Sequence, residues 1–253
     1  MAEGAIYPSL KGRTVLVTGG ASGIGESIVR HFVDQGSRVG FLDMDEKAAK
    51  ALQADLPKGA RVHFEKCDLR DIDALRRAVD GVRKALGPIT VLVNNAARDD
   101  RHSIESVTSE YWDERFAANL KHQFFCAQAV IPDMEKAGGG SIVNMGSVSW
   151  VIGQGNMPCY TTAKSAVQGL TRALARDLGP KNIRVNSILP GWIMTQRQID
   201  LWLTPEGEQE LMTRQCVKRK LMPADIARMV LFFASDDSGV CSNQNYIADG
   251  GWV

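Results

Sequence analysis

The chain has 253 residues, of which 44% are hydrophobic and 23% are charged, and its formal net charge is +1. A near-neutral chain of this composition is typical of a globular protein and lacks the basic excess that binds nucleic acid or anionic membranes. No apolar run approaches the roughly 20 residues of a membrane span, and the start of the chain lacks the pattern of a signal peptide. We therefore expect a cytoplasmic protein with no nucleic-acid partner and no membrane partner.

Cysteine and histidine give no sign of a disulfide framework or of a metal site. The five cysteines are an odd number, widely scattered, and no two form a C-x-x-C pair. Reduced thiols in a cytosolic protein fit this pattern better than disulfides. The four histidines show no metal-ligand spacing, so we expect no bound metal.

Seven short runs rich in apolar and β-branched residues alternate with longer amphipathic segments. Most runs are nearly continuous in apolar residues, which is typical of parallel strands covered on both faces. Between them, Ile24, Ile28 and Phe32 recur every fourth residue and so share one helix face. This alternation predicts a Rossmann-type α/β fold, a doubly wound seven-stranded parallel sheet flanked by helices on both faces. The predicted strands are 14–19, 38–44, 61–69, 89–97, 141–147, 183–191 and 245–251.

The domain organisation is expected to be simple. No linker, internal repeat or shift in composition divides the chain, so residues 1–253 are expected to form one domain. Residues 191–222 form the one long segment without strand character. We expect this segment to be a helical insertion or lid over the carboxyl edge of the sheet.

The first predicted strand runs into the glycine-rich stretch "TGGASGIG" (18–25) and then into a helix. Glycines in such a turn allow a tight bend and a close approach of the backbone to a ligand. The helix that follows offers free N–H groups and a positive dipole end to a pyrophosphate. The residues expected to bind a dinucleotide here are Gly19, Ser22, Gly23, Ile24 and Gly25.

An acidic residue, Asp43, ends the second predicted strand, 18 residues beyond Gly25. A carboxylate at this place can accept hydrogen bonds from the adenosine ribose hydroxyls and repel the extra phosphate of NADP. The sequence therefore favours NAD as the cofactor. The alternative is that Asp43 only caps the following helix.

Tyr160 and Lys164 are four residues apart in "YTTAK", so on a helix their side chains lie on the same face. Tyrosine has a pKa of about 10, and a role as a base near neutral pH requires a shift of about 3 units, or about 4 kcal/mol. A neighbouring ammonium in a desolvated cleft, with the charge of an oxidised nicotinamide, can supply much of this shift. Taken alone, the pair fits a solvated helix surface equally well.

Two further polar residues support a catalytic role for this pair. Ser147 follows a predicted strand, at the sheet edge where doubly wound folds bind ligands. The loop from Ser147 to Tyr160 is long enough to fold back, so both hydroxyls can face one reacting oxygen. Asn119 lies within an otherwise apolar helical pattern and is either catalytic or a satisfied core amide. Cys159, beside the tyrosine, is interpreted as a neighbour of the pocket rather than as a nucleophile.

The motifs "TGGASGIG", "VNNAA", "AANL", Ser147, "YTTAK" and "LPGWIMT", in this order, resemble those of the short-chain dehydrogenase/reductases over residues 11–253. The resemblance implies that Tyr160 is the general acid/base and that Lys164 lowers its pKa and binds the nicotinamide ribose. It implies that Ser147 polarises the substrate oxygen and that Asn119 holds a water in a proton relay. Ala97 stands where the family usually has glycine. The remaining cofactor contacts implied are Asp68, Leu69, Asn95, Ile193 and Thr195.

The substrate pocket of such a fold is expected from residues 98–104, 148–157 and 192–215. These segments are rich in polar side chains and tryptophan, which suits a polyhydroxylated ligand better than a steroid or a fatty acyl chain. Many of these charges fit solvated loops equally well. The expected substrate contacts, besides Ser147 and Tyr160, are Arg101, Trp150, Gln154, Asn156 and Trp192.

The stretches "DDRH", "GSVSW", "TPEGE" and "DGGW" resemble the bacterial aldose 1-dehydrogenases of this family, of the D-xylose and L-arabinose type. The resemblance implies oxidation of an anomeric hydroxyl to a lactone and a homotetramer. The alternative is a dehydrogenase of a 2-keto-3-deoxy sugar acid, whose carboxylate would be bound by arginine. The intact catalytic set disfavours an NAD-binding redox sensor. Asp43 disfavours an NADPH-dependent carbonyl reductase. The arginines that keep the sugar-acid alternative open are Arg98, Arg101, Arg197 and Arg214.

Overall fold

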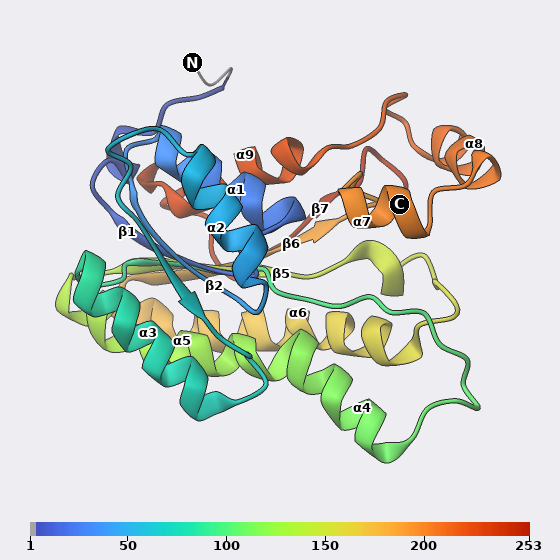
Figure 1. Cartoon of the computed structure of the whole chain (residues 1–253), viewed down its shortest axis with the longest axis horizontal. Coiled ribbons are helices and arrows are strands. Elements are labelled where there is room, and N and C mark those ends of the chain that lie inside the picture. The colour runs from blue at the N-terminus through green and yellow to red at the C-terminus, as the bar shows by residue number, and fades with distance from the viewer. Residues whose placement is uncertain (1–3) are drawn as a thin grey trace.

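A seven-stranded sheet runs through the centre of the computed structural model, which describes residues 4–253. The strand order is β3-β2-β1-β4-β5-β6-β7, and all neighbouring strands pair in parallel (Figure 1). The order reverses between β1 and β4, where doubly wound sheets bind their ligands. The predicted fold class is therefore confirmed. The strands are β1 (Thr14–Thr18), β2 (Arg38–Asp43), β3 (Val62–Lys66), β4 (Val91–Asn94), β5 (Gly140–Met145), β6 (Ile183–Pro190) and β7 (Asn245–Ala248).

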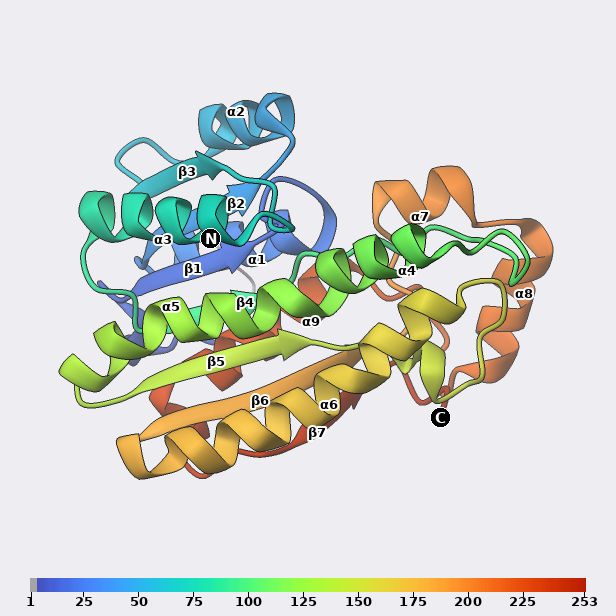
Figure 2. The same cartoon turned by 90° about the horizontal axis from the view of Figure 1, so that it is seen from below.

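Helices cover both faces of the sheet. Figure 1 shows α1 (Gly23–Asp34), α2 (Glu46–Asp55) and α9 (Pro223–Ala234) on one face. The opposite face is covered by α3 (Ile72–Leu86), α5 (His122–Lys136) and α6 (Pro158–Leu178), which lie in front of the strands in Figure 2. The short helix α4 (Ser109–Phe116) leads into α5. Within residues 4–253, no helix is long and apolar enough to cross a bilayer.

The two faces of the sheet bury separate apolar cores. Val15 and Val17 of β1 pack with α1 and α9, whereas Leu16 between them packs with the core under α3 and α5. Neighbouring side chains of a strand point to opposite faces, so a strand covered twice must be apolar at every position. This explains why the strands read as continuous apolar runs rather than as alternating ones.

Polar side chains on two neighbouring strands and a helix form a hydrogen-bonded series inside the protein. Asn94 of β4 donates to the Oδ1 atom of Asn144 of β5 at 2.9 Å, and Asn144 donates to the hydroxyl of Thr171 on α6 at 3.0 Å. All three side chains are fully buried. Because buried amides are costly unless they are hydrogen-bonded, these hydrogen bonds fix β4, β5 and α6 relative to one another.

The segment 191–222, expected to form an insertion or lid, contains α7 (Gln196–Leu201) and α8 (Pro205–Arg214). Figure 2 shows both helices beyond the carboxyl ends of β5 and β6. A single bridge between Ile193 and Leu221 joins the two ends of the segment. The segment is therefore anchored at its base, next to the end of β6.

We predict that Gly40→Ala destabilises the fold. A Cβ atom on Gly40 of β2 would lie 2.2 Å from the Cγ1 atom of Val82 on α3. Overpacking of a buried site costs about 1–3 kcal/mol, and the free energy of unfolding in urea should fall by this amount. Val82→Ala removes the clashing methyl groups, so the double variant should be more stable than the sum of the two single effects predicts. Strict additivity of the two substitutions would contradict this packing argument.

Candidate active site

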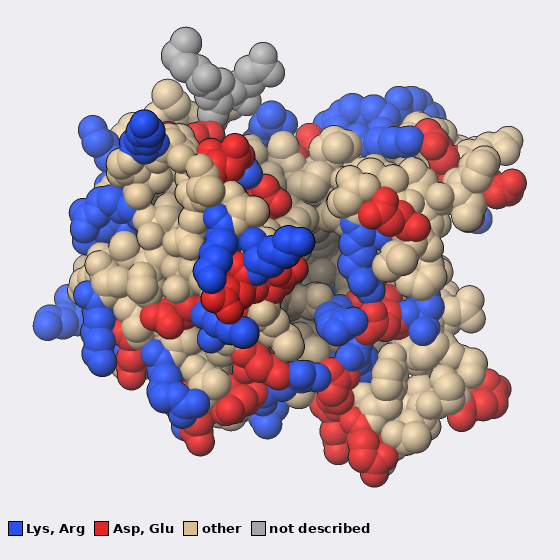
Figure 3. Space-filling model, in the orientation of Figure 1, with Lys and Arg blue, Asp and Glu red and all other residues tan. Residues whose placement is uncertain are grey.

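A cleft of about 1290 Å³ opens at the carboxyl ends of the strands. Figure 3 shows it as a hollow in the middle of the molecule, with acidic and basic side chains along its rim. The cleft runs from the glycine-rich turn after β1 to helices α7 and α8. Every residue expected to bind the cofactor lines it: Gly19, Ser22, Gly23, Ile24, Gly25, Asp43, Asp68, Leu69, Asn95, Tyr160, Lys164, Ile193 and Thr195.

The glycine-rich turn is tight and leaves no room for side chains at its glycines. Gly19 and Gly23 have φ angles of 65° and 57°, and a Cβ on Gly25 would lie 1.8 Å from the Gly19 carbonyl oxygen. No side chain of the described chain caps α1, whose N-cap is Ser22. The first N–H groups of α1 are therefore left to an anion at the cleft. These residues fit a dinucleotide cofactor.

Asn95 holds this turn against the end of β4. Its side-chain amide donates to the carbonyl oxygens of Thr18 and Gly19, each at 3.0 Å. The hydroxyl of Thr18 in turn accepts from the backbone N–H groups of Asn95 and Ala96 at 3.0 and 3.1 Å. The two loops on either side of the chain reversal are thus locked together before any ligand binds.

Asp43 lies in the cleft and not at a helix cap. Its Oδ2 atom accepts from the backbone N–H of Ala21 at 2.9 Å, and its Oδ1 atom accepts from that of Asp45 at 3.0 Å. The N-cap of α2 is Asp45, whose side chain accepts from the N–H of Ala48. The alternative that Asp43 merely caps the helix is therefore wrong. A carboxylate has about four acceptor positions, so Asp43 retains capacity for ribose hydroxyls.

Tyr160 and Lys164 lie on the same face of α6, as their spacing predicts. The Lys164 ammonium is 5.7 Å from the centre of the Tyr160 ring, and the lysine side chain is almost fully buried. Lys164 donates to the carbonyl oxygen of Met145, the last residue of β5, at 2.7 Å. This bond fixes the lysine, and with it the start of α6, at the sheet edge.

Ser147 lies two residues beyond the end of β5 and faces the tyrosine. Its hydroxyl accepts from the N–H of Ser149 at 3.1 Å, at the start of a short 3-10 turn, Val148–Trp150. Its hydrogen bond with Tyr160 lowers the pKa of the tyrosine. The structure therefore brings Ser147, Tyr160 and Lys164 together at one end of the cleft.

The pKa values of the pair differ from the expected pattern. Burial, reinforced by the charge of Asp99, raises the pKa of Tyr160 to about 12, although the Ser147 hydroxyl and Arg101 act in the opposite direction. Burial lowers the pKa of Lys164 to about 7, and Asp99 opposes this shift. The expected lowering of the Tyr160 pKa is therefore not produced by the protein alone, because desolvation outweighs the positive charge.

Asn119 is fully buried and does not line the cleft. It lies in a π-helical turn, Ala117–Lys121, between α4 and α5. Its Oδ1 atom accepts from the N–H of Arg98 at 2.8 Å, and its amide donates to the carbonyl oxygen of Arg115 at 2.9 Å. The side chain thus fastens the loop after β4, and the water-binding role implied by the resemblance stays a prediction.

Three of the five additional substrate contacts expected from the sequence line the cleft, namely Arg101, Gln154 and Trp192. Trp150 does not line it, because the 3-10 turn after Ser147 directs this residue to a separate small surface pocket. Asn156 is exposed, with a φ angle of 61°, and only its carbonyl oxygen is bonded, to the N–H of His102 at 2.8 Å. Residues of the cleft wall that sequence reasoning did not single out are Asp99, Met157, Gln198, Trp202 and Trp252.

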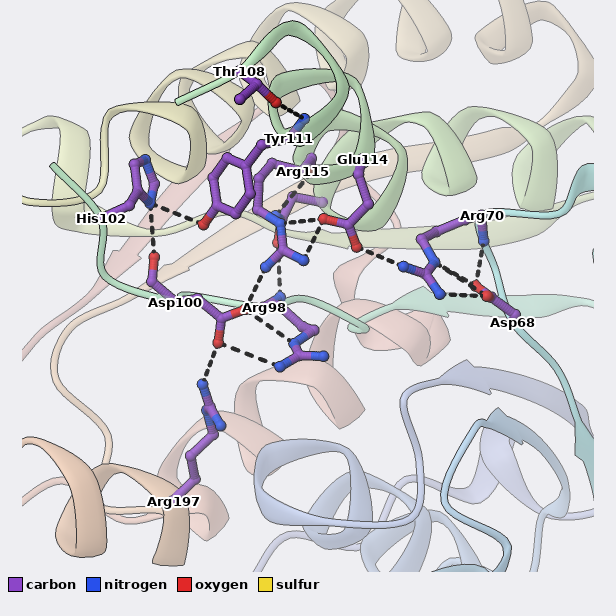
Figure 4. A network of polar contacts seen from close by, with 11 residues as sticks. Asp68, Arg70, Arg98, Asp100, His102, Thr108, Tyr111, Glu114, Arg115 and Arg197 are labelled. Carbon is purple, nitrogen blue, oxygen red and sulfur yellow. Dashed lines mark hydrogen bonds and ion pairs between the residues drawn. The ribbon is translucent and has the colours of Figure 1, made fainter. Parts of the chain in front are cut away.

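The arginines near the cleft are mostly neutralised by acidic residues. Arg98, Arg115 and Arg197 all contact the carboxylate of Asp100, as Figure 4 shows. Arg197 also contacts Asp99 at 3.4 Å. The same network continues through Glu114 and Arg70 to Asp68, the carboxylate expected near the adenine.

The chain has a Rossmann-type sheet, a glycine-rich turn, and a cleft lined by a serine, a tyrosine and a lysine. This is the architecture of a nucleotide-dependent dehydrogenase or reductase. The family model described as enoyl-(acyl carrier protein) reductase matches residues 19–253. Together with the relatives below, this match shows that the chain belongs to the short-chain dehydrogenase/reductase family. The predicted resemblance is confirmed.

Several named proteins are similar to the chain over almost its whole length. D-xylose 1-dehydrogenase of Caulobacter vibrioides is 46% identical over 250 residues, which is 98% of either chain. A Rhizobium meliloti protein named "Probable galactose dehydrogenase GalD" is 49% identical over 247 residues, covering 97% of this chain and 96% of its own. Among solved structures, a 7α-hydroxysteroid dehydrogenase complexed with NADH and 7-oxo glycochenodeoxycholic acid is 32% identical, with a TM-score of 0.92 and coverage of 97% and 96%.

We predict that the burial of Lys164 gives the stability of the protein a dependence on pH. Because its pKa is about 7 in the folded protein and 10.5 as its ordinary value, the unfolded chain binds more protons between these pH values. The free energy of unfolding therefore rises with pH in this window, by up to about 1.4 kcal/mol per pH unit from this group. Relative to Lys164→Met, the wild type should gain stability from pH 7 to 9 in urea titrations. A difference between the two proteins that stays constant over this range would contradict the shift.

Proposed function

We propose that the protein is an NAD-dependent sugar dehydrogenase that oxidises the anomeric hydroxyl of an aldose to the lactone. The observation that carries the proposal is the Ser147, Tyr160 and Lys164 group in a chain 46–49% identical, over nearly all its length, to D-xylose 1-dehydrogenase and to GalD. NAD, when bound, supplies the hydride acceptor and a positive charge near the reacting carbon.

The chain's own residues handle the proton. Tyr160 takes the proton of the sugar hydroxyl, while the Ser147 hydroxyl donates to the sugar oxygen and holds it against the tyrosine. Lys164 is a compact cation beside the Tyr160 ring and stabilises the phenolate. Because burial holds the Tyr160 pKa at about 12, the tyrosine stays a neutral phenol until further positive charge enters the cleft. Proton removal is thereby restricted to the loaded enzyme.

The preference for NAD over NADP is assigned to Asp43. Its carboxylate lies at the end of β2, beside the glycine-rich turn, with two acceptor positions already used by backbone N–H groups. The remaining lone pairs suit the two ribose hydroxyls, whereas a 2′-phosphate would face a fixed negative charge. Asp68 and Leu69 at the adenine end, and Ile193 and Thr195 after β6, are proposed to complete the cofactor site.

A neutral sugar fits the pocket better than a sugar acid. Arg98 and Arg197, which would favour a carboxylate, are already paired with Asp99 and Asp100. Arg214 lies 3.7 Å from Glu210. A carboxylated substrate would have to break such pairs or compete with them. Arg101 is the exception, because among the described residues it has no carboxylate partner, and the sugar acid therefore remains the alternative to be tested.

We further propose a cytoplasmic homotetramer in which the single domain closes residues 191–222 over the substrate. Unpaired cysteine thiols, two of them fully buried, suit a reducing compartment. Exposed aromatic side chains on α4 and α5, Trp112 at 38% and Phe124 at 41%, suit a contact between subunits.

The proposal is tested with a panel of aldoses and 2-keto-3-deoxy acids, each offered with NAD. The formation of NADH is followed by its absorbance. Wild type should reduce NAD with a neutral pentose or hexose. Tyr160→Phe is the matched control and should lose activity by at least about a thousandfold, because the general base is removed. Its affinity for NADH should stay within about threefold. Activity confined to carboxylated substrates, or a Tyr160→Phe variant with a near-normal rate, would refute the proposal.

We predict that Asp43→Ala weakens the binding of NAD and reduces the discrimination against NADP. Hydrogen bonds to a charged group contribute about 1.5–3 kcal/mol, so kcat/KM for NAD should fall about ten- to a hundredfold. The ratio of kcat/KM for NADP to that for NAD should rise at least tenfold. Asp71→Ala removes a carboxylate that caps α3 and should lower stability without changing this ratio. An unchanged ratio in Asp43→Ala would remove Asp43 from the cofactor site.

A further inference from the structure

Two adjacent carboxylates, Asp99 and Asp100, follow β4 and have very different surroundings. Asp100 contacts three guanidinium groups, those of Arg98, Arg115 and Arg197 (Figure 4). Its hydrogen-bonding capacity and its charge are therefore used within the protein. Asp100 serves to hold the loop after β4.

Asp99 is fixed in place but retains acceptor capacity. Its Oδ2 atom accepts from the side-chain amide of Gln198 on α7 at 2.7 Å, and its Oδ1 atom has only the longer contact with Arg197 at 3.4 Å. The indole N–H of Trp192 donates to the Oε1 atom of Gln198 at 2.9 Å, so the amide nitrogen must face Asp99. With about four acceptor positions on a carboxylate, at least two remain for a ligand in the cleft.

Asp99 lies beside the catalytic pair. It lines the cleft, its side chain is 18% exposed, and its charge raises the pKa of both Tyr160 and Lys164. Asp99, Tyr160 and Lys164 therefore face one cleft, and the carboxylate is close enough to act on both side chains through its charge.

Arg101 supplies the opposite charge on the same part of the wall. Its guanidinium lies over the ring of Trp202, 4.9 Å from the ring centre, and one of its nitrogens is 2.7 Å from the sulfur of Met157. Among the described residues, no carboxylate lies within 4 Å of this guanidinium. Arg101 lines the same cleft as Asp99, two residues further along the loop after β4, and its charge lowers the pKa of Tyr160. Apart from the nitrogen that contacts Met157, its donors have no partner among the described residues and can serve a ligand.

We propose that Asp99 and Arg101 form a hydroxyl-binding subsite next to Tyr160, in which Asp99 accepts from and Arg101 donates to the hydroxyls of a neutral polyhydroxylated substrate. A hydroxyl group is both donor and acceptor, so one carboxylate and one guanidinium match two neighbouring hydroxyls. The ring of Trp202 supports the guanidinium of Arg101 through a cation–π contact and so holds it in the cleft wall. The inference rests on the proposed sugar dehydrogenase function and names the residues that select its substrate.

Asp99 also excludes carboxylated substrates from this subsite. Two carboxylates in contact repel, and the repulsion is weakly screened in a partly buried cleft. Without the charge of Asp99, Arg101 becomes an uncompensated cation in the pocket. The preference for neutral substrates should then be lost in favour of anionic ones.

The test compares D-galactose with D-galacturonate, which differ only in a carboxylate in place of one hydroxymethyl group. Both are measured by kcat/KM with NAD, and by calorimetric titration into wild type and variants saturated with NADH. Two ratios are compared: the affinity for galactose divided by that for galacturonate, and the same ratio of kcat/KM. In Asp99→Asn, one or both of these ratios should be at least about a hundredfold lower than in wild type. Asp73→Asn removes an exposed carboxylate on α3, 79% exposed, and should leave both ratios within twofold. Arg101→Gln should lower the affinity for galactose about tenfold. In the double variant with Asp99→Asn, it should abolish the galacturonate binding that Asp99→Asn alone gains.

Each outcome decides one point. A folded Asp99→Asn with normal NADH affinity and an unchanged ratio overturns the subsite, and so does a wild type that binds galacturonate as well as galactose. If Asp99→Asn does not fold, a tenfold loss of galactose affinity in Arg101→Gln supports the subsite and its absence overturns it. If wild type binds galactose with the expected effect of Asp99→Asn but oxidises neither galactose nor any other aldose of the panel, the subsite stands and the proposed function fails.

Discussion

The constraint on which the rest of the structure depends is the burial of both faces of the parallel sheet. Strands covered twice have no room for reactive groups along their length, and the polar side chains inside, such as Asn94 and Asn144, are bonded to each other. Chemistry is therefore confined to the loops at the carboxyl edge. There the reversal of strand order between β1 and β4 separates two loops and opens the cleft that both the cofactor residues and the catalytic residues line.

At this edge, desolvation dominates the electrostatics. Lys164 is buried against the carbonyl oxygen of Met145, and Tyr160 is kept protonated although a cation lies beside its ring. In the proposed mechanism, Tyr160 is a base that is inactive by itself, because Ser147 and Arg101 only partly offset the cost of forming the phenolate. This arrangement makes catalysis depend on the ligands that fill the cleft, since they exclude water and change the local charge.

The sequence predicted the sheet, the glycine-rich turn and the clustering of Ser147, Tyr160 and Lys164 at one cleft, because each depends on local spacing or on the order of motifs along the chain. It could not decide between a cap and a cofactor contact for Asp43, since that depends on which of two nearby carboxylates faces the helix N–H groups. The sequence analysis also placed Trp150 in the pocket, because the composition of this segment does not indicate that a 3-10 turn follows Ser147. Asp99 was missed among several charged neighbours, because only the pairing pattern distinguishes it from Asp100.

The hydrogen bonds from Trp192 through Gln198 to Asp99 join the segment 191–222, which is proposed to close over the substrate, to the loop after β4, which is proposed to recognise it. A protein built in this way cannot vary the two independently during evolution. A substitution in α7 that displaces Gln198 also removes the hydrogen bond that fixes the carboxylate of Asp99. New substrate preferences in such a scaffold should therefore arise by paired changes, one in the loop after β4 and one in α7, rather than by single steps in either.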